Sequence, residues 1–251
     1  MEIGSWNLNG LMAVMKSGSL GFLKDLGPDA VCFQEIRTHQ EPVVLEGYHH
    51  YWNHGEVDGY SGTAILTREE PIRVMAGFCS GFSDKEGRVL TAELKSFYLV
   101  TAYFPAPRDE NLRRRAFRRA WDEALLDYIE TLHEEKPVIL CGDFNVAREP
   151  IDIFEGNMRQ YYAQQGYTSD ERSDLETLID NGFTDAFRAL HPGVQSFTWW
   201  SRRLNKRREN RGWRLDYFLV SDELMRKIRD VRHLSDVEGS DHCPILLEAA
   251  L

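Results

Sequence analysis

The chain has 251 residues, of which 42% are hydrophobic and 28% are charged, and its net charge at pH 7 is −10. This composition predicts a globular protein with a substantial core, and the negative charge excludes a protein that coats nucleic acid by charge alone. No apolar run approaches the roughly 18 to 20 residues that cross a bilayer, and the start, MEIGSWNLNG, is not a signal peptide. We therefore expect a cytoplasmic protein, associated with the nucleoid in a prokaryote.

Short strands and helices alternate along the chain, without a linker or a detectable repeat. Strand-like runs of apolar, β-branched and aromatic residues are expected at 2–8, 30–36, 63–67, 89–94, 97–104, 138–145, 216–220 and 244–249. One strong helix is predicted over 110–134, where the apolar positions form a single stripe. Weaker helices are predicted over 13–26, 171–181 and 184–190.

Two segments are rich in arginine, and we interpret them differently. The first, RRRAFRR at 113–119, falls on the side of the strong helix opposite its apolar stripe, which favours a solvated helix face. The second, RRLNKRRENRGWR at 202–214, has seven Lys or Arg residues against one Glu. We call this second segment the basic loop.

The four cysteines, Cys32, Cys79, Cys141 and Cys243, are scattered and form no C-x-x-C pair. Three of them lie in or beside strand-like runs. This pattern indicates buried, reduced thiols rather than a disulfide framework or a zinc site.

Polar residues recur directly at the ends or starts of the predicted strands. They are Asn7, Asn9, Gln34, Glu35, Tyr103, Asp143, Asn145, Asp216, Asp241 and His242. Singly, such residues are common in turns, but together beside apolar strands they are costly to desolvate unless a cation or a substrate satisfies them. Oxygen ligands without a cysteine cage favour a hard cation such as Mg²⁺ or Mn²⁺ and phosphate chemistry. The spacing alone does not show that the strands converge.

Six motifs occur in a fixed order between residues 6 and 245: WNLNG, QEIRT, AYFP, GDFN, GWRLDY and GSDHCPI. Through these six motifs, the chain resembles the exonuclease III family of apurinic/apyrimidinic DNA-repair nucleases, which belongs to the endonuclease/exonuclease/phosphatase superfamily. The resemblance implies a four-layer α/β sandwich, in which two mixed β-sheets pack face to face with helices on the outside. It also implies a single domain over residues 1–251. GDFN and SDH are shared with lipid and inositol phosphatases, whereas GWRLDY and FTWW are typical of the DNA-repair branch.

The resemblance also implies a metal site and a catalytic set. The ligands of Mg²⁺, for which Mn²⁺ can substitute, would come from Asn7, Glu35, Asp143, Asn145, Asp241 and His242. The catalytic residues would be Tyr103, Asp143, Asn145, Asp216 and His242. Asp143 would orient and deprotonate the attacking water or belong to a second metal site, and Asn145 would position that water. Asp216 would hold His242 against a phosphate oxygen, and Tyr103 would contact the phosphate or the leaving group. The identity of the general base stays open.

The DNA-binding residues implied by the resemblance fall into three groups. Trp199 and Trp213 would line the pocket for an extruded abasic sugar. The basic loop would face DNA through Arg203, Arg207 and Arg208, with Arg203 at the position of an inserted wedge. The loops around Tyr60 and Arg88 would contact the DNA backbone.

The implied function is Mg²⁺-dependent hydrolysis of phosphodiester bonds 5′ to abasic sites in double-stranded DNA by a monomer, with 3′→5′ exonuclease and 3′-repair activity. The loop after GDFN departs from the family pattern, because IDIFEGNMRQYYAQQGY is longer and offers only Asn157, with Gln164 and Gln165 as substitutes. Incision at uracil or another damaged base is therefore an alternative. A phosphatase acting on a lipid or small-molecule phosphate and an inactive DNA-binding module are further alternatives. Trp213 and the basic loop weigh against the phosphatase, and the complete carboxylate set weighs against the inactive module.

Overall fold

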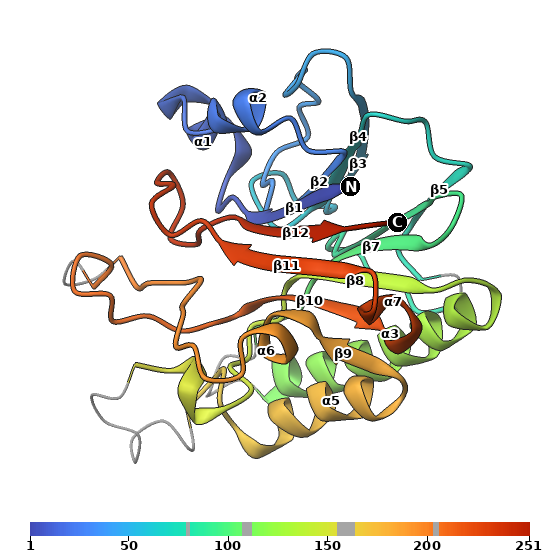
Figure 1. Cartoon of the computed structure of the whole chain (residues 1–251), viewed down its shortest axis with the longest axis vertical. Helices are drawn as coiled ribbons and strands as arrows, with labels where there is room; N and C mark the ends of the chain where they lie inside the picture. The colour runs from blue at the N-terminus through green and yellow to red at the C-terminus, as the bar shows by residue number, and fades with distance from the viewer. Residues whose placement is uncertain (79–80, 107–111, 155–163, 203–205) are drawn as a thin grey trace.

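The protein is described from a computed structural model, which covers residues 1–78, 81–106, 112–154, 164–202 and 206–251 (Figure 1). Two six-stranded sheets form its centre, with the strand orders β11-β12-β1-β2-β4-β3 and β5-β6-β7-β8-β10-β9. β1 is parallel to β2, and β7 is parallel to β8, whereas the other strand pairs in these sheets are antiparallel. Both sheets are therefore mixed, as predicted.

The first sheet consists of β1 (Glu2–Asn7), β2 (Ala30–Gln34), β3 (His49–Asn53), β4 (Thr63–Thr67), β11 (Ile228–His233) and β12 (Ile245–Ala249). The second sheet consists of β5 (Arg73–Ala76), β6 (Val89–Glu93), β7 (Tyr98–Tyr103), β8 (Val138–Asp143), β9 (Phe183–Asp185) and β10 (Asp216–Ser221). The helices are α1 (Leu11–Ser17), α2 (Phe22–Leu26), α3 (Leu112–Glu135), α5 (Ser169–Asp180), α6 (Ala186–Leu190), α7 (Asp222–Met225) and the 3₁₀ turn η1 (Pro150–Asp152).

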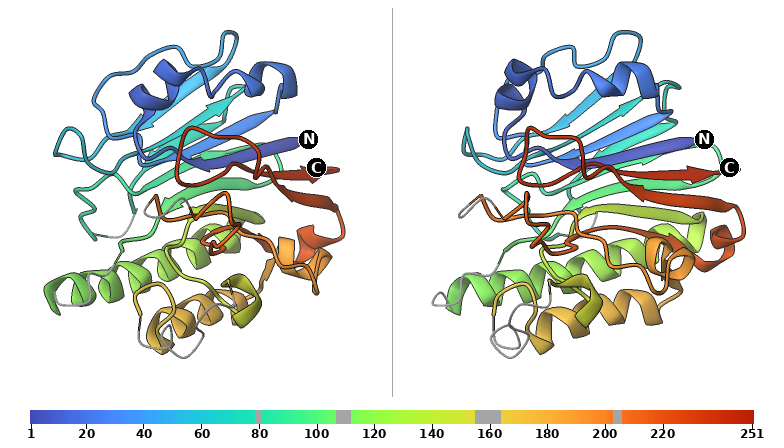
Figure 2. Two further views of the ribbon diagram at one scale, coloured as in Figure 1. Left: turned by 90° about the vertical axis from the view of Figure 1, so that its left-hand side faces the viewer. Right: turned by 60° about the vertical axis from the view of Figure 1, so that its left-hand side comes forward.

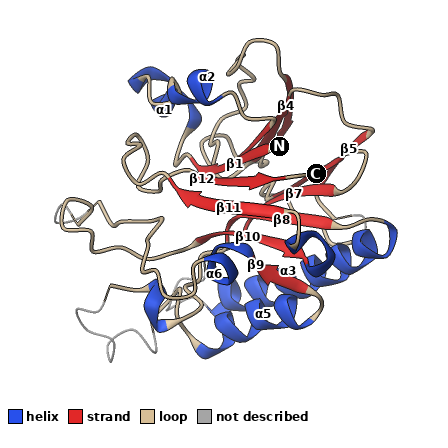
Figure 3. Ribbon diagram, in the orientation of Figure 1, coloured by secondary structure: helices blue, strands red, loops and turns tan. Residues whose placement is uncertain are grey.

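Helices cover the two outer sides of the sheet pair, whereas α6 packs against β10 of one sheet and β11 of the other. Figures 2 and 3 show α1 and α2 beyond the first sheet, and α3 and α5 beyond the second. Alternation along β8 explains this layering: Ile139 and Cys141 pack between the sheets, whereas Val138 and Leu140 pack toward α3. Because a strand sends successive side chains to opposite faces, a strand covered on both faces reads as a continuous apolar run. The predicted four-layer α/β sandwich is confirmed.

Four strands, β3, β5, β9 and β11, were not predicted. They occupy all four outer edges of the two sheets. β3, β5 and β11 each contain exposed positions, whereas β2, β4 and β8 are buried throughout. An edge strand is partly solvated, so polar residues interrupt the pattern by which a strand is recognised.

Two further expectations need correction. The helix predicted over 13–26 divides into α1 and α2, because Gly18 adopts a φ of 75° and ends α1 in the left-handed conformation. The arginine face of α3 is not uniformly solvated: Arg113, Arg115 and Arg119 are exposed, but Arg118 is only 4% exposed.

The three described cysteines, Cys32, Cys141 and Cys243, are buried free thiols as predicted, and Cys79 lies outside the described residues. Within the described ranges, no helix has the length and apolarity to span a membrane.

Candidate active site

The predicted polar residues converge at one edge of the sheet pair. Asn7 ends β1, Tyr103 ends β7 and Asp143 ends β8, so these strands deliver their last residues to the same side. β10 runs antiparallel to β8, and Asp216 at its start is the register partner of Asp143. Asp241 and the neighbouring histidine precede β12, which is antiparallel to β1. The tertiary structure thus supplies the convergence that spacing could not show.

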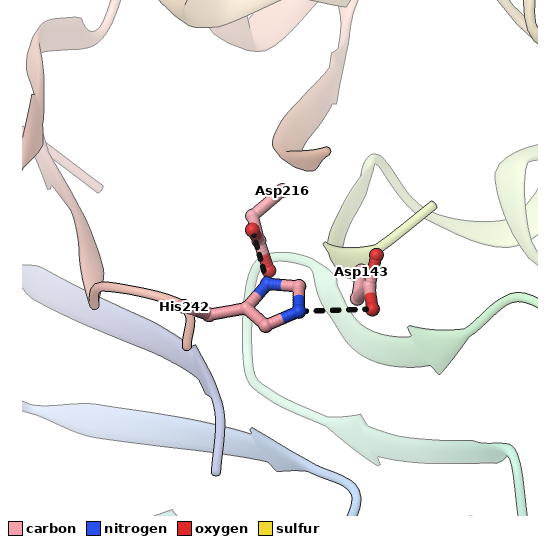
Figure 4. Close-up of side chains that lie close together, drawn as sticks. All are labelled: Asp143, Asp216 and His242. Carbon is pink, nitrogen blue, oxygen red and sulfur yellow. Dashed lines mark hydrogen bonds and ion pairs between the residues drawn. The ribbon is translucent and has the colours of Figure 1, made fainter. Parts of the chain in front are cut away.

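Asp143, Asp216 and His242 form a buried group that we call the acid–imidazole centre (Figure 4). The Nδ1 atom of His242 lies 2.8 Å from Asp216 Oδ2, and its Nε2 atom lies 3.7 Å from Asp143 Oδ2. The three residues are 1%, 1% and 5% exposed, and one ligand atom from each lies within 4.8 Å of the others. The centre is thus a possible metal site.

Electrostatics in this centre favour a charged imidazole. Burial lowers the pKa of His242, but the negative charges of Asp216 and Asp143 outweigh this effect and raise the pKa to about 10. Burial raises the pKa of Asp143 to about 7; the charge of His242 lowers this pKa, and those of Asp216 and Glu35 raise it. A protonated imidazole donates hydrogen bonds from both nitrogens and has no lone pair for a cation. Metal binding through His242 therefore requires its deprotonation.

Asn7 connects the acid–imidazole centre to the other carboxylates. Its Nδ2 atom donates to Glu35 Oε1 at 2.9 Å and to Asp143 Oδ2 at 2.8 Å, and the side chain is fully buried. Its Oδ1 atom accepts from the backbone N–H of Asn9 at 2.9 Å. The Nδ2 atom of Asn9 in turn donates to Asp241 Oδ1 at 2.5 Å. Two asparagine amides therefore join three carboxylates into one network.

Several residues of this network have unusual backbone conformations. Asn9, Glu35 and Asn145 have φ values of 49°, 50° and 53°, in the left-handed region that non-glycine residues rarely adopt. Such conformations typically cost about 1–3 kcal/mol each and persist where surrounding contacts hold them. Arg37, which has a φ of 51°, makes an ion pair with Glu35. Arg37 was not among the predicted site residues, although it belongs to the motif QEIRT.

Asn145 and Tyr103 lie beside the centre with defined partners. The backbone N–H of Asn145 donates to Asp143 Oδ1 at 2.9 Å, and its side-chain amide donates to the carbonyl of Phe104 at 2.9 Å. Tyr103 is 8% exposed, and burial together with the charge of Glu35 raises the pKa of its phenol well above the usual value. The phenol therefore stays protonated at neutral pH and can donate a hydrogen bond.

Arg88 lies beneath the surface, unlike the DNA-facing position that the resemblance implies. It is 1% exposed and pairs with Glu86 at 2.6 Å. It also donates to the carbonyl of Tyr103 at 2.8 Å and to the hydroxyl of Tyr60 at 3.2 Å. Its guanidinium lies 4.3 Å from the centre of the Tyr103 ring. Arg88 thus holds the backbone and the ring of Tyr103 from the interior of the protein. Tyr60, in contrast, is 37% exposed and lies at the surface.

Trp199 and Trp213 pack edge to face, with ring centres 6.4 Å apart. Trp213 belongs to a small apolar cluster with Ala147, Ile153, Tyr167 and Leu215, against which Trp199 also packs. The indole N–H of Trp199 donates to Asp241 Oδ2 at 3.4 Å. Trp199 also forms a backbone bridge with His242. The aromatic pair therefore adjoins the carboxylate network directly.

The arginines of the basic loop occupy different environments. Arg207 donates to the backbone carbonyls of Ser235, Val237 and Ser240 at 2.9, 2.6 and 2.9 Å, and it lies over the Trp200 ring. Arg208 is exposed and lines an open groove of about 640 Å³ together with Arg202, Arg207, Ser235, Asp236, Glu238, Gly239 and Ser240. Arg203 and Asn157 lie outside the described residues, and Gln164 and Gln165 precede Gly166.

Comparisons with known proteins identify the family of the chain. Residues 4–242 match the model of the Endonuclease/Exonuclease/phosphatase family. The chain is 43% identical to the exodeoxyribonuclease of Bacillus subtilis (strain 168), covering 98% of each chain. It is 40% identical to the DNA repair nuclease APEX1 of Danio rerio, covering 100% of this chain and 83% of that one. The solved structure of the 3′ phosphatase NExo from Neisseria, bound to a product DNA hairpin, matches with a TM-score of 0.92 and 26% identity, covering 100% of both chains.

Proposed function

The chain belongs to the Endonuclease/Exonuclease/phosphatase family and is a phosphodiester hydrolase of its exonuclease III branch, and from this premise we propose that it cleaves DNA 5′ to abasic sites with Mg²⁺ as cofactor. One observation carries the proposal: the Trp199–Trp213 pair adjoins the carboxylate network, with an indole N–H only 3.4 Å from Asp241. A small aromatic wall beside phosphate-cleaving groups suits a sugar that has lost its base.

The residues of the network fit a hard cation. The atoms that could bind a metal ion are carboxylate and amide oxygens, apart from the imidazole nitrogen of His242. Negative charge is in excess in a dry site, since burial and the charges of Asp216 and Glu35 raise the pKa of Asp143. The Asp216 Oδ1 atom is also buried without a hydrogen-bond partner among the described residues. We propose that Glu35 and Asp241 would hold Mg²⁺, with help from Asn7 and Asp143, and that the bound cation would supply positive charge to neutralise the scissile phosphate and the leaving oxygen.

We propose the following roles for the chain's own catalytic groups. The Nε2 atom of His242 lies 3.7 Å from Asp143, which is too long for a hydrogen bond, so its N–H is available to the substrate. His242 donates a hydrogen bond from Nε2 to a non-bridging phosphate oxygen. Asp216 holds the ring through Nδ1. Asp143 orients and deprotonates the attacking water, and its carboxylate is held in place by the side chain of Asn7 and the backbone N–H of Asn145.

The neighbours of these groups complete the proposed reaction. Asn145 positions the water through its side-chain oxygen, because its amide nitrogen is bound to Phe104. The protonated phenol of Tyr103 donates to the phosphate, and Arg88 holds the tyrosine backbone and ring in place. Trp199 and Trp213 receive the extruded sugar, and the contacts in this pocket offset the cost of extruding it.

The test compares the wild-type protein with Glu35→Gln and with Glu69→Gln. Glu69 is a matched control because its carboxylate is 81% exposed and pairs only with Lys95 among the described residues. Each protein is assayed on an abasic duplex, a recessed 3′ end, a 3′-phosphate end, a uracil duplex and inositol phosphate, with Mg²⁺ or with chelator.

We expect the abasic duplex to be cleaved fastest, and activity to disappear in chelator and return with Mg²⁺. Glu35→Gln should weaken Mg²⁺ binding and lower the rate together, whereas Glu69→Gln should match the wild type. Fastest turnover on the uracil duplex or on inositol phosphate would replace the proposed substrate. Full activity after extensive chelation would refute the metal requirement.

A further inference from the structure

Arg118 is a buried cation that the proposed reaction does not use. It lies on α3 in the segment that the sequence assigns to a solvated face, yet it is 4% exposed. Its Nε atom pairs with Asp122 one helical turn later. Its Nη1 atom donates to the backbone carbonyls of Pro105 at 3.0 Å and Phe144 at 3.2 Å. A buried guanidinium needs partners for its charge and its donors, and here a carboxylate accepts from Nε and two main-chain oxygens accept from Nη1.

One of these oxygens belongs to the peptide group that orients Asp143. The peptide between Phe144 and Asn145 presents its C=O to Arg118 and its N–H to Asp143 Oδ1, at 2.9 Å. The two ends of a single planar group are therefore held by the arginine and by the proposed base. The same peptide leads into Asn145, whose φ of 53° is unfavourable for a non-glycine residue. Without Arg118, one of the contacts that oppose rotation of this peptide is lost.

The other oxygen belongs to the neighbouring catalytic motif. Pro105 closely follows Tyr103 in the motif AYFP, and the carbonyl of Phe104 accepts from the Asn145 side chain. The rings of Phe104 and Phe144 stack with their centres 4.2 Å apart. The guanidinium of Arg118 lies 5.0 Å from the centre of the Phe104 ring. One side chain thus joins the AYFP and GDFN loops to each other and to α3.

We propose that Arg118 is a positioning residue, which aligns Asp143 and Asn145 by holding the Phe144–Asn145 peptide against the AYFP loop. The role rests on the proposed function of Asp143 as the group that activates water. A lysine cannot reproduce it, because one ammonium on a flexible stem cannot match the fixed fork that reaches Asp122 and both carbonyls. Misplacement of a catalytic group by about 1 Å can cost on the order of 10²-fold in rate.

The experiment compares Arg118→Met and Arg118→Lys with Arg119→Met on the full chain. Arg119 is the matched control: it is the next residue on α3, it also pairs four residues ahead, with Glu123 at 3.9 Å, and its side chain is 78% exposed. We expect kcat on the abasic duplex to fall about 10- to 100-fold in Arg118→Met and by an intermediate factor in Arg118→Lys. KM should change less than about 3-fold, because substrate contacts are not removed. Arg119→Met should keep wild-type kcat.

A double-mutant cycle separates positioning from general destabilisation. If Arg118 acts through Asp143, then Arg118→Met combined with Asp143→Asn should lower kcat little beyond Asp143→Asn alone. Thermal denaturation identifies a temperature at which every variant is folded, and all rates are measured there. If the two substitutions lower kcat by independent factors that multiply in the double variant, the proposal is overturned. A wild-type kcat in folded Arg118→Met would overturn it too. If the wild type cleaves only the recessed 3′ end, the abasic-site proposal fails, and the same cycle on that substrate still decides the role of Arg118.

Discussion

The acid–imidazole centre and the basic loop both concentrate charge, but they hold it under opposite conditions. In the centre, each charged group is at most 5% exposed, and fixed partners lie within 4 Å. In the basic loop, Arg208 is exposed to solvent. Interactions between buried charges are screened little by water or salt, whereas those of exposed charges are screened strongly. The centre is therefore suited to setting rate, and the exposed part of the loop to setting affinity.

The basic loop itself is not uniform. Arg214 is fully buried in ion pairs with Asp152 and Asp185, and Arg207 is bound to three backbone carbonyls. Ser240, one of the residues that Arg207 holds, directly precedes Asp241 and donates its hydroxyl to the carbonyl of Asn7. Counting positive charges in the segment therefore overstates the number that can meet a phosphate. Burial and main-chain contacts decide which arginines build the site and which face the substrate.

The largest effects should come from the acid–imidazole centre. Asp143→Asn and His242→Ala should each lower kcat by roughly 10²–10⁴-fold, the range usual for removal of a general acid or base. Affinity for abasic DNA should stay within a few-fold, because neither side chain contributes most of the phosphate contacts. Single-turnover rates and equilibrium binding on one duplex measure both quantities. Near-normal turnover in Asp143→Asn would contradict the role proposed for it.

An intermediate effect should come from the aromatic pair. Trp213→Ala should reduce the preference for abasic over intact duplex by roughly 10- to 100-fold. The reason is that contacts in the pocket offset the few kcal/mol that extrusion of a nucleotide costs. Binding to intact duplex should change little and serves as the internal control. Affinities for the two duplexes, measured side by side, give the ratio. Unchanged selectivity would show that the lesion is recognised elsewhere.

The smallest effects, and the sharpest contrast, should lie within the basic loop. Arg208→Ala should weaken binding to damaged and intact duplex equally, by a few-fold, and should reduce the salt slope of affinity by about one. Arg207→Ala should instead lower kcat more than affinity, because it releases the carbonyls of the segment that leads to Asp241. Binding at two salt concentrations, together with kcat, distinguishes the two arginines. Identical behaviour of the two variants would show that Arg207 also serves mainly as a phosphate contact.

The sequence by itself determined the central strands, the long helix and the set of polar residues at strand ends. β2, β4 and β8 are buried on both faces, so their runs of apolar residues are continuous and easy to recognise. The helical stripe of α3 is similarly clear, because burial on one side imposes its period on the residues. The six motifs then specified the family, and the family match over residues 4–242 together with the full-length relatives confirms it.

Only the tertiary structure decided how those residues meet. The pairing of Asp143 with Asp216 depends on the register of β8 with β10, between residues far apart in the chain. The edge strands β3, β5 and β11 escaped prediction because solvent on one side admits polar residues and breaks the pattern, and β9 has only three residues. The burial of Arg88 and Arg118 also escaped it, since arginine is usually exposed and a local pattern cannot reveal main-chain oxygens that other segments supply. Side-chain periodicity is a local property of the chain, whereas the partners of a buried charge are set by long-range packing.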